Sequence, residues 1–62
     1  MSRKYIIMRD NQDEYERPII EPFDVVSSMS RADDICRIEE AKAEQKGESW
    51  IYFWVEVISS ED

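Results

Sequence analysis

The feature that most constrains this chain is an apolar run near its C-terminus, "WIYFWV" at residues 50–55. A strand with one face in water alternates apolar and polar side chains, because successive side chains point to opposite faces. Six consecutive apolar residues break that alternation and predict a strand with apolar groups on both faces. A chain of 62 residues must therefore cover two faces of a sheet with very little protein.

The length predicts one domain, residues 1–62, with a thin core, because short chains bury a smaller share of their surface than long ones. Cys36 is the only cysteine and histidine is absent, so the sequence has neither an intrachain disulfide nor the ligands of a structural zinc site. Small domains without such links depend on good packing or on association. Dimerisation, or docking on a larger protein, is therefore expected.

One helix is predicted after residue 29. Ser30 with Asp33 three residues later resembles a capping box, and Gly47 follows Lys46 as a C-terminal cap would. Six residues on one half of the helical wheel are expected to face the core: Met29, Ala32, Ile35, Cys36, Ile38 and Ala43.

Three strands are predicted around this helix. Residues 3–9 are apolar enough for the centre of a sheet, and residues 49–59 contain the apolar run. Residues 15–20 are the predicted second strand, at an edge because Pro18 cannot donate a ladder hydrogen bond. Residues 21–24 are expected to form a loop or turn.

The order is therefore β-β-α-β, an α+β fold. The simplest topology is a three-stranded antiparallel sheet of order 2-1-3 with the helix on one face. Val25 and Val26 fit either the end of a strand or the start of the helix, and residues 59–62 are expected to be frayed. One helix covers one sheet face, so the other face needs a different cover.

The third strand decides which side chains lie on that second face. If its odd-numbered apolar residues face the helix, the aromatic Trp50, Tyr52 and Trp54 point outward. The opposite register is possible and also leaves a large apolar face. The outward aromatics are the predicted anchors of an interface, since such residues dominate binding sites. A loop at residues 18–23, the segment before the helix, a second copy or another protein could each cover them.

The net charge of −7, from fifteen acidic and eight basic residues, disfavours binding to nucleic acid or anionic membranes. It favours a basic protein partner. Several acidic residues follow the first strand, and two more form a row on the predicted helix. The acidic residues expected to bind a partner are Asp10, Asp13, Glu14, Glu16, Glu40 and Glu44.

Catalytic and cofactor chemistry finds little support in the sequence. Cys36 lies on the apolar helix face without a histidine to activate it, so a core role is expected. Asp10, Gln12 and Glu14 have a spacing seen in calcium loops, but Tyr15 stands where such a loop needs glycine. A solvated hairpin turn is the simpler interpretation. We expect a protein that is not an enzyme, with no metal and no cofactor.

The N-terminal "MSRKY" lacks an apolar signal core. The stretch at residues 49–58 is about half the length that crosses a bilayer, and Glu56 interrupts it. A single cysteine suits a reducing compartment. The sequence therefore predicts a cytoplasmic protein.

In length, acidity, absence of histidine and its β-β-α-β unit, the chain resembles the small phage-encoded counter-defence proteins, notably anti-CRISPR proteins. The resemblance implies a stoichiometric inhibitor that binds the basic surface of a nuclease or DNA-recognition complex and blocks nucleic acid. Some proteins of that class imitate the DNA backbone with carboxylates. Here Arg37 lies among the acids of the predicted helix, so acidic loops around an aromatic centre fit better. The alternative is a structural or assembly protein whose aromatic sheet face forms a homodimer.

Overall fold

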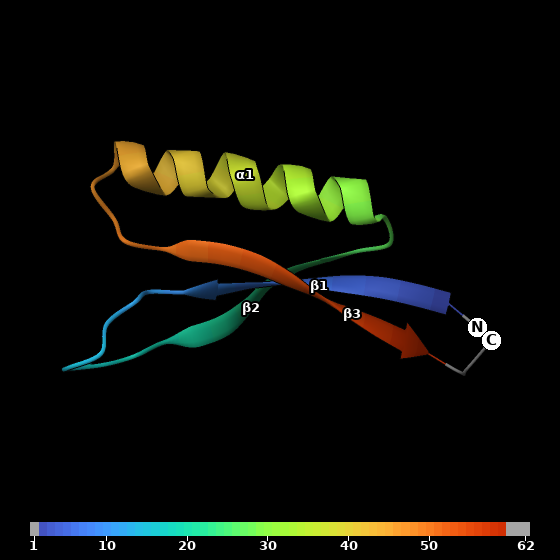
Figure 1. Cartoon of the computed structure of the whole chain (residues 1–62), viewed down its shortest axis with the longest axis horizontal. Helices are drawn as coiled ribbons and strands as arrows, with labels where there is room; N and C mark the ends of the chain where they lie inside the picture. The colour runs from blue at the N-terminus through green and yellow to red at the C-terminus, as the bar shows by residue number, and fades with distance from the viewer. Residues whose placement is uncertain (1, 60–62) are drawn as a thin grey trace.

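The computed structural model describes residues 2–59 and has the predicted α+β architecture (Figure 1). Strand β1 spans Ser2–Asp10, β2 spans Ile20–Val26, helix α1 spans Met29–Gln45, and β3 spans Ile51–Ser59. The three strands form one sheet of order β2-β1-β3 with both pairs antiparallel. The predicted fold class and strand order are confirmed. Of the residues expected to fray, Ser59 ends β3 and residues 60–62 lie outside the described range.

The molecule has two layers, with α1 on one face of the sheet (Figure 1). Its Cα atoms extend over 41 × 23 × 10 Å, so the domain is thin. The core lies between α1 and the sheet, where Ile7 at the middle of β1 is fully buried. Ile7 pairs with Asp24 of β2 and with Trp54 of β3, so the central strand holds both neighbours in register.

The predicted second strand at residues 15–20 is wrong, because residues 15–19 belong to the loop between β1 and β2 and Ile20 is the first residue of β2. Side chains at the start of the loop hold its backbone. The amide oxygen of Asn11 accepts hydrogen bonds from the backbone N–H groups of Asp13 and Ile19. The Asp13 carboxylate accepts from those of Tyr15, Glu16 and Arg17. Such bonds give the backbone an alternative to a sheet ladder.

Residues 21–24, expected as a loop, instead lie within β2. Pro22 is accommodated by a β-bulge, in which Met8 pairs with Pro22 and Ile7 with Asp24, leaving Phe23 as the extra residue. The bulge and the edge position make the missing N–H tolerable. The second strand is a proline-containing edge strand, as expected. It spans Ile20–Val26 rather than residues 15–20, and its proline is Pro22 rather than Pro18.

The start of α1 also differs from the prediction. Ser28 is the N-cap, and its hydroxyl accepts a hydrogen bond from the backbone N–H of Arg31. The predicted capping box of Ser30 with Asp33 is wrong, because the helix begins two residues earlier and its first turn contains no acidic side chain. Val25 and Val26 belong to β2.

The end of α1 agrees with the prediction. Gly47 has φ of 74°, a left-handed conformation that glycine adopts without strain. Its N–H donates to the carbonyl of Glu44, and the N–H of Glu48 donates to that of Ala43. This pattern, with Lys46 as the C-cap, is a Schellman motif.

The buried stripe of α1 is narrower than predicted. Ala32, Cys36 and Ala43 are buried, whereas Met29 and Ile38, expected in the core, are about half exposed. Small side chains on the stripe let the helix approach the bulky aromatic groups of the sheet closely. Met29 and Ile38 lie at the margins of this face and stay exposed.

Candidate functional site

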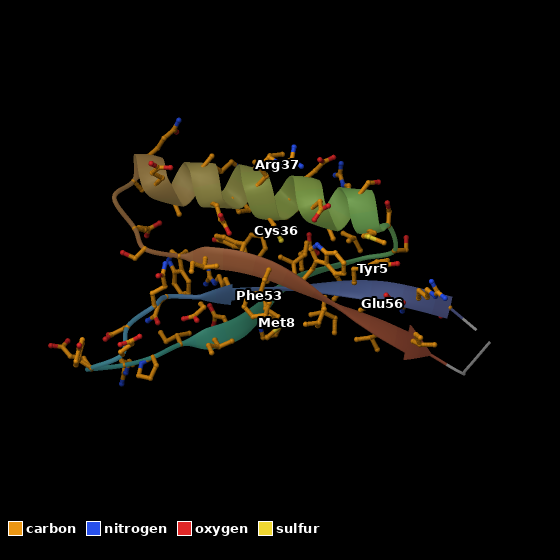
Figure 2. All side chains as sticks on the ribbon, viewed as in Figure 1. Tyr5, Met8, Cys36, Arg37, Phe53 and Glu56 are labelled. Atoms are coloured by element: carbon orange, nitrogen blue, oxygen red, sulfur yellow. The ribbon has the colours of Figure 1, made fainter. Side chains whose placement is uncertain are left out.

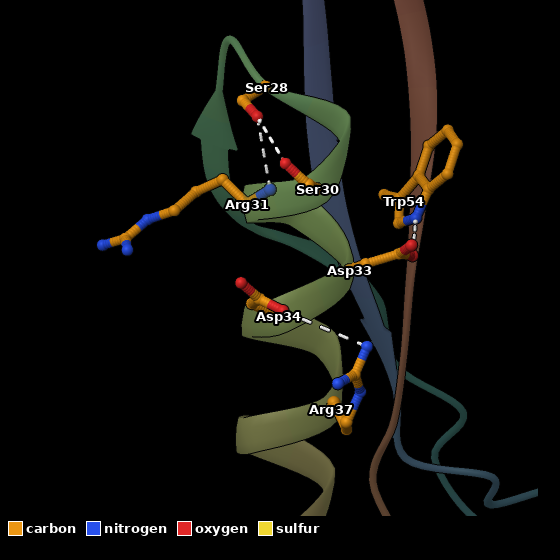
Figure 3. A network of polar contacts seen from close by, with 7 residues as sticks. All are labelled: Ser28, Ser30, Arg31, Asp33, Asp34, Arg37 and Trp54. Atoms are coloured by element: carbon orange, nitrogen blue, oxygen red, sulfur yellow. Dashed lines mark hydrogen bonds and ion pairs between the residues drawn. The ribbon is translucent and has the colours of Figure 1, made fainter.

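Trp50, Tyr52 and Trp54 lie on the side of the sheet that faces α1, and this corrects the main site prediction. Tyr52 is only 8% exposed and belongs to the core. The indole Nε1 of Trp54 donates a hydrogen bond of 2.8 Å to Asp33 of the helix (Figure 3). Trp50 packs against the same core. The prediction that Trp50, Tyr52 and Trp54 face outward as interface anchors is therefore wrong.

The aromatic groups are packed edge to face. The rings of Tyr5 and Trp54 lie 5.4 Å apart at 86°, and those of Phe23 and Tyr52 lie 5.2 Å apart at 80°. Aromatic rings favour this geometry because the positive edge of one meets the negative face of the other. The large rings of the sheet thus fill the space that the small residues of α1 leave.

Trp50 also takes part in a cluster around Arg9. The guanidinium carbon of Arg9 lies 4.3 Å from the centre of the Trp50 ring and 5.6 Å from that of Phe23. Its Nε donates to a Glu21 carboxylate oxygen at 2.7 Å. The hydrogen bond to Glu21 is the main cause that raises the pKa of Arg9. These contacts are internal, so Trp50 serves the fold.

The side chains that point away from α1 form the open face of the sheet. Alternation from the buried Tyr5 and Ile7, together with the strand register, assigns its members. Figure 2 shows two of them, Met8 and Phe53, on the side of the sheet opposite α1. The open face comprises nine apolar residues: Ile6, Met8, Ile20, Pro22, Val25, Ile51, Phe53, Val55 and Val57.

The open face is uncovered within residues 2–59. Phe53 is 40% exposed, and Ile51, Val55 and Val57 are each 41% exposed. Residues 18–23, one expected cover, instead continue into β2 beside β1. Only Lys4 and Asp10, at opposite ends of the β1 row, bring formal charge to this face. Charged residues make up 37% of the chain, so the open face is poor in charged side chains.

The acidic residues of the β1–β2 loop have different roles. The Asp10 carboxylate accepts from the backbone N–H of Gln12 at 2.8 Å. Hydrogen bonds from the backbone N–H groups of Glu16, Tyr15 and Arg17 lower the pKa of Asp13. Asp10 and Asp13, both predicted to bind a partner, therefore also hold the loop.

Glu14 and Glu16 are exposed at the tip of this loop. Within residues 2–59, neither carboxylate has a hydrogen bond or ion pair. Below the tip, a shallow hollow adjoins the end of the open face, lined by Asp10, Asp13, Glu14, Pro18, Ile20 and Ile51. Three of the predicted acidic residues thus come together, beside apolar side chains.

The predicted acidic row on α1 does not join them. The Glu40 carboxylate accepts a hydrogen bond of 2.9 Å from the backbone N–H of Tyr52. This bond satisfies a backbone group on the outer edge of β3, where an unpaired strand would invite another chain. Glu44 is exposed on the helix. Both lie on the side of the sheet opposite the open face, so they form no single patch with the loop acids.

Within residues 2–59, the Cys36 thiol is not placed for nucleophilic chemistry. Cys36 is a free, buried thiol, as predicted, and burial is the main cause that raises its pKa, with Glu40 and Asp33 adding to the effect. A raised pKa disfavours the nucleophilic thiolate. Among residues 2–59, no group of three or more histidine, cysteine or acidic side chains is placed to hold a metal ion.

No helix in the described part of the chain has the length and apolar character needed to span a membrane.

The open face was missed because both faces of β3 are apolar. One signal in the sequence distinguishes them: buried tryptophan and tyrosine need partners for their N–H and O–H groups. Asp33 lies on the same side of α1 as Cys36 and provides such a partner for the indole N–H of Trp54. Glu40, on the same side of α1, accepts from the backbone N–H of Tyr52. The side chains of Ile51, Phe53 and Val55 have no polar atom and need none.

In comparisons with known proteins, no family model matches this chain, and no curated protein and no solved structure shows significant similarity to it.

Proposed function

We propose that this protein is a non-enzymatic binding protein that associates with other protein through the open face of its sheet. The observation that carries the proposal is the continuous apolar surface of nine side chains that no described residue covers. Exposed apolar surfaces that are continuous and rimmed by polar groups are typical of interaction sites.

Composition supports the same function. Specific interfaces are depleted of charge at their centre, and the open face has charged side chains only at Lys4 and Asp10. A two-layer domain of 62 residues also gains much from covering its second sheet face, because it buries little surface alone. Association therefore serves both binding and stability.

The proposal can be tested with a photoreactive side chain placed on each surface. The change Phe53→p-benzoylphenylalanine puts the probe on the open face, and the same change at Ile38 puts it on the exposed side of α1 as a control. We expect illumination in living cells to give protein adducts from position 53, lost when Val55→Lys is added. Equal adducts at both positions, or none at position 53, would contradict a binding role for the open face.

A second function, inhibition of a basic nucleic-acid-binding protein, is favoured by the exposed Glu14 and Glu16 and the acidic hollow beside them. A stoichiometric inhibitor would place this acidic loop on the basic surface of a nuclease or DNA-binding complex. The resemblance to anti-CRISPR proteins in size, charge and architecture agrees with such a partner. In this proposal the apolar open face takes the place of the expected aromatic centre of Trp50, Tyr52 and Trp54.

The inhibitory function makes a separate test possible with the partner that the photoreactive probe identifies. Attraction between unlike charges weakens as salt screens it, so the affinity should fall with ionic strength. Glu14→Lys should slow association, whereas Asp34→Lys on the outer side of α1 should leave it nearly unchanged. Binding that is insensitive to salt and to Glu14→Lys would contradict this function.

The free, buried Cys36 supports a protein that works in a reducing compartment such as the cytoplasm. Fractionation of cells expressing the chain tests this: recovery in the cytoplasmic fraction is expected, and export would contradict it.

A further inference from the structure

We propose that the open face is occupied by a second copy of this chain, packed face to face with its strands antiparallel. This inference rests on the proposed function, because it names the partner of the same surface. The two-fold axis lies between the sheets and crosses the strands at a right angle. The product is a four-layer dimer with the two sheets inside and both helices outside.

Charge selects this orientation. Lys4 and Asp10 stand at opposite ends of the open-face row of β1. When the two β1 strands run antiparallel and cross at their centre, Lys4 of each copy lies over Asp10 of the other. The parallel alternative would place Lys4 over Lys4 and Asp10 over Asp10. The antiparallel arrangement therefore makes two identical attractive pairs, as an isologous interface requires.

The hollow at the end of the open face strengthens this complementarity. Asp10, Asp13 and Glu14 line it together with apolar side chains. In the antiparallel dimer, the lysine that reaches this end belongs to the second copy. Its ammonium group meets the carboxylates while its aliphatic stem covers the apolar lining. The exposed Glu16 at the tip stays outside the contact.

The apolar side chains are complementary under the same symmetry. Crossing at the centre of β1 places Ile6 of one copy over Met8 of the other. The register of β3 against β1, which pairs Ile6 with Val55 and Met8 with Phe53, then places Phe53 over Val55 of the second copy. At the Phe53–Val55 contacts a large ring faces a smaller side chain, and at the Ile6–Met8 contacts a flexible methionine meets a branched side chain, so the two faces can interdigitate.

The size of the contact is sufficient for a specific small dimer. Three strands about 4.8 Å apart, rising about 3.3 Å per residue, give a face about 14 Å wide and 25–30 Å long. Two such faces remove on the order of 1,000 Å² from water, the size at which specific interfaces begin. Each copy then covers about a tenth of its 4,897 Å² of accessible surface, the usual share for a small protein.

Sedimentation across a wide dilution series tests the orientation. We expect the wild-type protein to sediment at twice the chain mass and to dissociate on dilution. Lys4→Glu and Asp10→Lys should each raise the dissociation constant about tenfold, because two pairs become repulsive. The double variant reverses both pairs and should restore the dimer. Circular dichroism on each variant separates weakened association from loss of folding, and failure of the double variant to restore the dimer would overturn the antiparallel arrangement.

A second pair of variants tests the surface. Val55→Lys should raise the dissociation constant about a hundredfold, since it places two charges at the centre of the contact. Ile38→Lys, on the outer side of α1, should leave the dimer intact. A folded wild-type monomer at every concentration would overturn the dimer. If the probe at position 53 still formed adducts with another protein, the proposed function would stand without it; if it formed none, both would fail.

Discussion

The indole Nε1 of Trp54 donates a hydrogen bond of 2.8 Å to the carboxylate of Asp33, and this contact joins β3 directly to α1 (Figure 3). Together with the bond from the backbone N–H of Tyr52 to Glu40, it holds the side of β3 that carries Tyr52 and Trp54 against the helix. The other side of the strand, with Ile51, Phe53 and Val55, faces away. These two contacts, Asp33 with Trp54 and Glu40 with Tyr52, thus determine which face of the sheet remains available for association.

The Trp54–Asp33 contact should contribute measurably to stability. In a double-mutant cycle of Trp54→Phe and Asp33→Ala, we expect a coupling free energy of about 1 kcal/mol, because the bond is to a carboxylate but is partly exposed. Urea denaturation of the four proteins measures it. Trp54→Phe combined with Asp34→Ala is the control, since Asp34 instead lies 4.0 Å from Arg37. If the effects of Trp54→Phe and Asp33→Ala on the free energy of unfolding simply add, the result would contradict the contact.

Core and surface isoleucines should respond differently to the same change. Ile7→Val removes a methyl group from a fully buried side chain and should lower the free energy of unfolding by about 1 kcal/mol. Ile38→Val acts on a side chain that is 52% exposed, and it should change the free energy of unfolding by less than about 0.5 kcal/mol. Thermal or urea unfolding of both variants decides whether Ile38 belongs to the core.

The C-terminal cap of α1 depends on the backbone of Gly47. A Cβ at this position would meet no atom within 4 Å, so only the left-handed conformation opposes substitution. We expect Gly47→Ala to lower the free energy of unfolding by about 1 kcal/mol. Gly47→Asn should have a smaller effect, because asparagine tolerates this conformation better. Equal effects of the two changes would contradict this explanation.

The Asp13 carboxylate should make stability depend on pH at the acidic end. Its pKa is lowered from the ordinary value of 3.8 by hydrogen bonds from the backbone N–H groups of Glu16, Tyr15 and Arg17. A lowered pKa in the folded state gives stability that is fully present above the ordinary value and is lost as pH falls through the folded value. The urea midpoint of Asp13→Asn should therefore lie below that of wild type near neutral pH and converge with it below about pH 3.8.

The control for this titration is Glu16→Gln, which removes a carboxylate of the same loop that accepts no hydrogen bond within residues 2–59 and lies outside the proposed dimer contact. Its urea midpoint should stay close to that of wild type over the same pH range. A difference for Asp13→Asn that stayed constant down to acidic pH would show that the loop does not depend on the charged carboxylate.

The parts of the fold that follow from the pattern of apolar residues or from the conformational freedom of glycine were predictable from the sequence. The apolar run of β3, the central position of β1 and the cap at Gly47 each have one physical interpretation. The position of β2 has no single interpretation, because Pro18 and Pro22 each permit either a loop or a bulged edge strand. The side-chain bonds of Asn11 and Asp13, which hold the loop open to residue 19, decide between them.

The candidate site was harder to predict, because it depends on which face of β3 meets the helix. Aromatic residues are favoured both at interfaces and in cores, so their type alone does not distinguish the two. Polar partners on α1 and the small residues of its buried stripe draw the large rings inward. The acidic residues were correctly expected near the first strand, but Asp13 and Glu40 are occupied by internal hydrogen bonds.

The most direct test of face-to-face association is an isotope-filtered nuclear Overhauser experiment on a mixture of labelled and unlabelled protein. It reports proton contacts between copies alone. The antiparallel dimer predicts cross-peaks between Ile6 and Met8 methyl groups and between the Phe53 ring and Val55 methyl groups. Intermolecular cross-peaks from Met29 or Ile38 instead, or none at the highest attainable concentration, would contradict association through the open face of the sheet.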